Sequence, residues 1–379
     1  MYDIFAQVTN VRKVEQLVSN VFTQAIYGDE GGRRLRKLEY IYQKGNRIWM
    51  DLPEEERDAF FQLFLMKIHA SYYMNHEFYF SDRSILSHDR GNWQSADRYI
   101  EMSRSMMDYR RKMLEYYNKR MNDGKWIKIL TPEAFPPPRI PMYPAGKPAL
   151  KISGNPKMKL FLWDGESVEE HGYIKVYQFG IHQKWFEIGN QGIGEVKYRI
   201  RISEGTEWLS VSSIEGSVKE EERIYIKVEE PLTCAGEKAE IEVLDIGNGS
   251  RVILTLEVEE MPQIPDGFEG VIEADGYLVF RAERYNRFSG SKECGFQEVK
   301  GIGRYEGSCM MAYNEKLCSL EEDFTKGMPI PWLEYNFFLT SSGQYELEIE
   351  RYLTLNSKGR IRLGIEVDKE RRKGLLIFS

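Results

Sequence analysis

The sequence is poor in the residues and motifs that most directly indicate a chemical function. Its 379 residues include four cysteines, and none belongs to a C-x-x-C pair: Cys234, Cys294, Cys309 and Cys318. Structural zinc sites need such paired thiolates, so we expect free, partly buried thiols in a reducing compartment. The chain also lacks a G-x-S-x-G elbow and a G-x-x-x-x-G-K-[ST] loop. The best-marked hydrolase and nucleotide-binding motifs are therefore excluded.

Long apolar runs and a basic charge balance are missing too. No stretch approaches 18 consecutive apolar residues, so we expect no membrane-spanning helix. Met1–Gln7 lacks a basic region followed by an apolar one, so we expect no secretory signal and a cytoplasmic location. The net charge of −7 weighs against a nucleic-acid partner, which needs a basic face. The chain begins almost inside an amphipathic helix, which suggests that an upstream module is missing or is encoded separately.

What is present is a change of pattern near residue 130. Before it, apolar residues recur at steps of three and four, which is typical of helices with one buried face. We expect an antiparallel helical bundle over residues 1–128, with a first helix from Ile4 to Ala25 that ends at the glycines of residues 28–32. Residues 129–156 are rich in proline and predict an extended linker.

After the linker, short alternating runs broken by glycine, proline and asparagine predict β structure. Residues 157–260 predict an immunoglobulin-like β-sandwich, with strands at 197–202, 223–228, 239–243 and 251–258. Residues 266–379 predict a second, jelly-roll or galactose-binding-like β-sandwich, with a hairpin formed by 333–339 and 343–349. The expected fold class is thus multidomain: a helical bundle followed by two β-sandwich modules.

Several local strings, in this order, resemble one family. They are Gly124–Trp126 followed by prolines, Phe280–Glu283, Gly301–Arg304, Leu333–Tyr335, Ser342–Tyr345 and Leu353–Asn356. The chain resembles the C-terminal half of glycoside hydrolase family 115, the xylan α-1,2-glucuronidases. In that family, a catalytic barrel precedes a helical bundle and β-sandwich modules.

The resemblance implies an accessory role, because this sequence has no barrel and no catalytic residue can be carried onto it. We expect no activity from the chain alone. Implied partners are a catalytic barrel domain, a xylan-type oligosaccharide and a second copy of the chain in a homodimer. Two alternatives remain open: a free-standing carbohydrate-binding or scaffold protein, and a complete enzyme with its cleft between bundle and sandwich.

Candidate binding residues come from the β part. Stacking on a sugar needs an aromatic platform, for which Trp332, Trp163 and Trp185 are candidates, whereas Trp208 is expected in a core. Glu273 and Glu283 are candidate ligands of a structural calcium, because oxygen donors at strand ends suit that ion. The five histidines are scattered and do not indicate a metal site.

Overall fold

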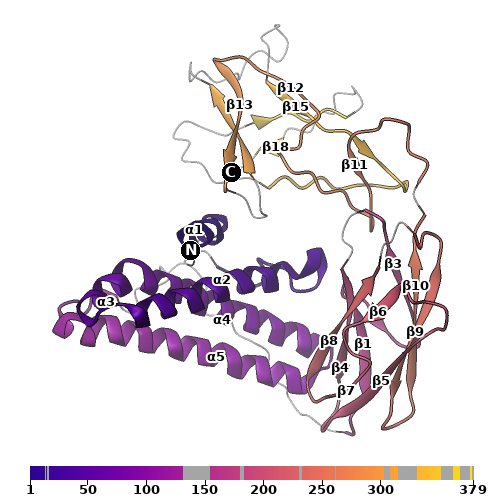
Figure 1. Cartoon of the computed structure of the whole chain (residues 1–379), viewed down its shortest axis with the longest axis horizontal. Helices are drawn as coiled ribbons and strands as arrows, with labels where there is room; N and C mark the ends of the chain where they lie inside the picture. The colour runs from indigo at the N-terminus through magenta and orange to yellow at the C-terminus, as the bar shows by residue number, and fades with distance from the viewer. Residues whose placement is uncertain are drawn as a thin grey trace. The chain divides into compact units, whose positions relative to one another are not determined.

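The computed structural model describes residues 1–12, 14, 17–130, 154–179, 183–229, 233–260, 262–302, 308–314, 331–350, 362–367 and 376–377. By internal contacts the chain divides into two units, residues 1–341 and residues 342–379. Figure 1 labels the helices and strands of both units where there is room. The predicted proline linker falls mostly outside the described residues.

The first part of the chain is helical, as predicted. Its helices are α1 (Tyr2–Val11), α2 (Ile26–Asp51), α3 (Glu54–Phe60), α4 (Met66–Asp89) and α5 (Trp93–Glu115), with the shorter turns η2 (Phe61–Leu65), η3 (Tyr116–Arg120) and η4 (Met121–Gly124). Helix α4 packs against both α2 and α5 (Figure 1). The helices share apolar clusters that include Leu38, Leu65 and Met113, so the helical part has its own core.

The predicted first helix is wrong. Helix α1 ends at Val11, and residues 17–25 are not helical. The glycine-rich stretch begins a helix rather than ending one. Asp29 has a φ of 52° and its Oδ1 accepts a hydrogen bond from the Gly32 amide at 2.9 Å. The Asp29 carboxylate thus satisfies the Gly32 amide within the first turns of α2, as a capping side chain does at a helix N-terminus.

The next part contains two five-stranded sheets. The first has the order β2-β1-β4-β8-β6, formed by Ser167–Val168, Met158–Leu162, Lys184–Asn190, Glu221–Val228 and Leu209–Val211. The second has the order β3-β10-β9-β5-β7, formed by His171–Val176, Arg251–Val258, Lys238–Asp245, Val196–Ile202 and Glu215–Val218. Strands β3 and β10 pair in parallel, and the other neighbours are antiparallel. The four predicted strands correspond to β5, β8, β9 and β10.

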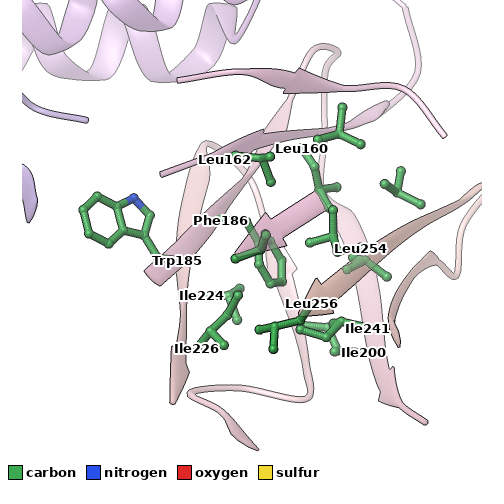
Figure 2. Packing of buried hydrophobic residues seen from close by; sticks show 14 of the residues in the cluster. Leu160, Leu162, Trp185, Phe186, Ile200, Ile224, Ile226, Ile241, Leu254 and Leu256 are labelled. Atoms are coloured by element: carbon green, nitrogen blue, oxygen red, sulfur yellow. The ribbon is translucent and has the colours of Figure 1, made fainter. Parts of the chain in front are cut away.

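The two sheets enclose one apolar core, seen from close by in Figure 2. Leu160, Phe186 and Ile224 come from the first sheet, and Ile241 and Leu254 from the second; all five are fully buried. In β9 and β10 buried and less buried residues alternate, which places one face of the sheet in the core. Each such side chain contributes about 1.5–3 kcal/mol by its burial.

The remaining strands are short and paired in twos. In the first unit, β11 (Val271–Ile272) pairs with β16 (Phe337–Phe338), β12 (Arg287–Ser289) with β15 (Trp332–Glu334), and β13 (Cys294–Lys300) with β14 (Ser308–Asn314). In the second unit, β17 (Arg362–Leu363) pairs with β18 (Leu376–Ile377). The predicted hairpin of 333–339 and 343–349 is wrong, because residues 343–349 form no strand.

Candidate functional site

The most developed polar feature is a cluster of buried charges that joins the helices to the first sheet. Three arginines bind the carboxylate of Glu187, which lies on β4. Arg83 Nη2 lies 2.8 Å from Glu187 Oε1, Arg90 Nη1 2.6 Å from Oε2, and Arg223 Nη2 2.8 Å from Oε1. Arg83 and Arg90 come from α4 and its C-terminal end, and Arg223 from β8. One strand carboxylate is therefore shared between two modules.

Two further carboxylates complete the cluster. Arg83 Nε donates to Glu221 Oε1 at 2.9 Å, and the Tyr99 hydroxyl donates to the same oxygen at 2.9 Å. Arg223 Nη1 lies 2.7 Å from Asp29 Oδ2, at the start of α2. We call Asp29, Arg83, Arg90, Glu187, Glu221 and Arg223 the clamp. Its three arginines balance its three carboxylates in charge.

The electrostatics of the clamp favour the charged forms of Glu187 and Arg83. Burial alone would raise the pKa of Glu187, but Arg83, Arg223 and Arg90 outweigh it and hold that pKa well below its usual range. Burial alone would lower the pKa of Arg83, whereas Glu187 and Glu221 raise it well above normal. Removing one member of such a buried set leaves charges uncompensated, at a cost of about 3–5 kcal/mol.

The local sequence explains why β4 has a charged side chain in its buried contact with the helices. Every residue of β4 is buried, because one face lies in the core and the other is covered by the helices. Phe186 and Ile188 take the core face, so Glu187 takes the helix face. Gly189 lies on that same face, and a Cβ there would meet Asn92 Nδ2 at 2.3 Å. The absent side chain lets the α4–α5 turn approach the strand.

This arrangement is unsuited to glycoside cleavage. A glycosidase acid needs a raised pKa and an open position beside the scissile bond. Glu187 has a lowered pKa and both of its oxygens are occupied by arginines. The clamp is therefore a structural joint between the helices and the first sheet.

The three predicted sugar platforms lie in different surroundings. Trp163 is 9% exposed, and the Lys184 ammonium lies 3.6 Å from its ring centroid. Trp185 is 3% exposed, and the Arg223 guanidinium lies 4.7 Å from its ring centroid. Burial leaves neither ring a face that a sugar can cover. Trp332 on β15 is 44% exposed and stays a prediction. Trp208 packs against the core, as expected.

The two predicted calcium ligands also differ. Glu273 is buried, and its carboxylate accepts hydrogen bonds from the amides of Thr340 and Ser341, at 2.8 and 3.0 Å, and from the Ser341 hydroxyl at 2.6 Å. It thereby fixes a turn after β16. Glu283 is half-buried. Within the described ranges, no three His, Cys, Asp or Glu side chains gather as a metal site would require.

The bundle histidines have structural partners. His69 Nε2 lies 3.0 Å from Asn46 Oδ1, and burial lowers the pKa of His69 to about 4. His76 Nδ1 lies 2.8 Å from the Tyr72 carbonyl oxygen, and burial lowers the pKa of His76 as well. Both rings are thus neutral core residues near pH 7.

Three of the four cysteines lie among the described residues. Cys234, Cys294 and Cys309 are free thiols, and Cys318 lies outside the described residues. In the part of the chain that the structure describes, no helix is both long and apolar enough to cross a membrane.

The sequence analysis missed the clamp, although one signal was available. Glu187 stands between Phe186 and Ile188 in an otherwise apolar run, and a charge in such a run needs a buried partner. The partners Arg83 and Arg90 lie about a hundred residues earlier in the chain. Only the tertiary fold brings them to β4.

Comparison with known proteins bears on the last part of the chain. Residues 270–376 match the family model described as "Glycosyl hydrolase family 115 C-terminal domain". This confirms the predicted resemblance, namely to a C-terminal part of that family. No match was found among curated proteins.

One similar solved structure is a Bacteroides ovatus GH5 xyloglucanase in complex with a XXXG heptasaccharide. Its identity to this chain is 18%, the match covers 30% of this chain and 21% of that chain, and the TM-score is 0.20. At this TM-score the likeness carries no argument about fold or function.

Proposed function

We propose that this chain is an accessory, non-catalytic C-terminal portion of a xylan α-1,2-glucuronidase-like glycoside hydrolase. The observation that carries the proposal is the match of residues 270–376 to the C-terminal domain of family 115. The order of helices followed by antiparallel sheets agrees with it. In this proposal, the first β module is an immunoglobulin-like sandwich and the last a jelly-roll-like one, and they support a catalytic barrel, dimerisation or xylan contact.

The geometry supports such a role through rigidity. The clamp ties α2 and α4 to β4 and β8 with buried ion pairs, so these helices and the first sheet form one body. A body of this kind suits the support of a neighbouring domain. The three carboxylates of the clamp are each engaged by an arginine, which suits the clamp poorly for acid–base chemistry.

The proposal is tested with glucuronoxylan oligosaccharides and a separately produced family 115 catalytic barrel. We expect the purified chain alone to release no glucuronic acid, and the mixture to elute as a complex in size-exclusion chromatography. Release of glucuronic acid by the chain alone would contradict the proposal, as would separate elution of the two proteins.

One observation favours the second candidate, a free-standing carbohydrate-binding protein. Trp332 is exposed and pairs with Ser289 across the β12–β15 ribbon. Two positions along, Arg287 and Glu334 form an ion pair on the same face of the ribbon. An exposed ring flanked by polar groups is the composition of a sugar platform.

Affinity electrophoresis against xylan tests this second candidate. If the ribbon binds, Trp332→Ala should reduce the retardation several-fold, because the stacking surface is lost. Phe288→Ala is the matched control: Phe288 is 64% exposed on the partner strand but pairs with Leu333, on the opposite face. Unretarded migration of the unaltered chain, or equal effects of both substitutions, would count against the candidate.

A further inference from the structure

Residues 17–25 cross the helices as an irregular segment without a charged side chain, which we call the strap. Leu17 at its start is buried in a small apolar cluster with Met74 and Phe78 of α4. At its other end, Gln24 Nε2 donates to the Tyr79 carbonyl at 2.9 Å. The strap is therefore attached to α4 at both ends.

The middle of the strap is attached through one carboxylate. The Asn20 amide donates to Asp82 Oδ2 at 2.8 Å, and Asn20 holds a left-handed φ of 59°. Asp82 is only 7% exposed, and its other oxygen, Oδ1, is buried with no hydrogen-bond partner among the described residues. Asp82 also lines a cavity beneath the strap, whose walls include Leu17, Phe22 and Phe78.

The surroundings of Asp82 disfavour its charge. Burial raises the pKa of Asp82 to about 6, although the Asn20 amide and the Ser19 side chain act in the opposite direction. From α2, Arg34 lines the same cavity, but its Nε donates to Asn75 Oδ1 and its guanidinium lies over Phe22. On α4 itself, Tyr79 lines the cavity with a pKa raised to about 12, and Arg83 is engaged in the clamp.

The sign of the effect follows from these contacts. With the strap in place, the pKa of Asp82 lies above its ordinary value of 3.8. Protonation therefore favours the closed strap, and ionisation favours a state in which water reaches the carboxylate. Closure is strongest at acidic pH and weakens as the pH rises through about 6.

The end of the strap at Thr23 and Gln24 is held by hydrogen bonds that do not depend on the protonation of Asp82. The Gln24 carbonyl accepts a hydrogen bond from Arg223 Nη2 at 3.2 Å, and the Gly31 amide donates to the Thr23 carbonyl at 2.8 Å. These bonds tie Thr23 and Gln24 to the clamp and to α2. Any opening is confined to the residues before them.

We propose that residues 17–22 are the pH-sensitive part of the strap, which Asp82 closes over the cavity at acidic pH and releases at higher pH. Two features make the closed and open states of the strap respond to the protonation of Asp82. One is the carboxylate oxygen without a hydrogen-bond partner, and the other is the absence of charged side chains from the strap. The device lies in the helical part and is independent of the function proposed above.

Native-state hydrogen exchange of the full chain tests the proposal, with rates corrected for intrinsic exchange. We expect protection of the Leu17 and Asn20 amides to fall about tenfold between pH 5 and pH 8, the ratio that pKa values of 3.8 and about 6 imply. The Gly31 amide should keep its protection. If Asp82 were merely a hydrogen-bond acceptor, Asn20 would instead be protected better at high pH.

Two variants sharpen the test. Asp82→Asn holds the neutral state, so its strap protection should not vary with pH. Glu77→Gln is the control, because Glu77 is also a buried acid of α4 but pairs with Arg110 and does not line the cavity. The proposal is overturned if wild-type protection at Asn20 does not change with pH, or if Asp82→Asn retains the wild-type change.

Discussion

At the scale of single residues, Glu187 is the central carboxylate of the joint between the helices and the first sheet. Its carboxylate receives Arg83, Arg90 and Arg223 in a buried joint. We predict that Glu187→Gln lowers the free energy of unfolding by about 3–5 kcal/mol, because three buried cations lose a shared counter-charge. Urea unfolding measures this. Glu215→Gln is the control: Glu215 pairs with Arg199 on the surface, so its loss should cost at most about 1 kcal/mol.

Glu187 also makes the free energy of unfolding depend on pH. Because the folded-state pKa of Glu187 is held below its ordinary 4.5, its contribution is complete above that value and is lost as the pH falls further. The difference in stability between the unaltered chain and Glu187→Gln should therefore shrink on acidification below about pH 4.5. A difference that grows there would contradict the assignment.

At the scale of elements, the sequence predicted best where one face of a strand is buried. Strands β9 and β10 alternate in burial, and their alternating sequences marked them. Strand β4 is buried on both faces, so it has no alternation to detect. The helical spacing of residues 12–25 was misleading, because Leu17 and Phe22 pack on α4 from an irregular strap. The sequence around Asp29 could not show whether a helix begins or ends there, because glycine is found at both ends of helices.

At the same scale, the turn between α4 and α5 lies close to β4, and a substitution at Gly189 tests this contact. Gly189→Ala would place a Cβ 2.3 Å from Asn92 Nδ2, so the buried Asn92 side chain, the strand or the turn must shift. We predict a loss of about 1–3 kcal/mol, the usual range for overpacking. Thermal unfolding measures it. Gly343→Ala is the control, since a Cβ there meets nothing within 4 Å; equal effects of the two substitutions would refute the close approach.

At the scale of the whole molecule, the central proposal is that this chain supports a catalytic barrel that is a separate protein. The sequence predicted the helical and β parts and the family of residues 270–376. It did not predict the clamp, which depends on residues brought together from α2, α4, β4 and β8. For the same reason, the sequence could not separate the candidate sugar platforms: it offered Trp163, Trp185 and Trp332, and the fold buries the first two rings and leaves the third exposed.

The most direct measurement is the thermal unfolding midpoint of a separately produced family 115 catalytic barrel, recorded with and without this chain in excess. Binding to the folded barrel must stabilise it by mass action, so we predict a higher midpoint that depends on the concentration of the chain. A midpoint that stays the same at every concentration would contradict the supporting role.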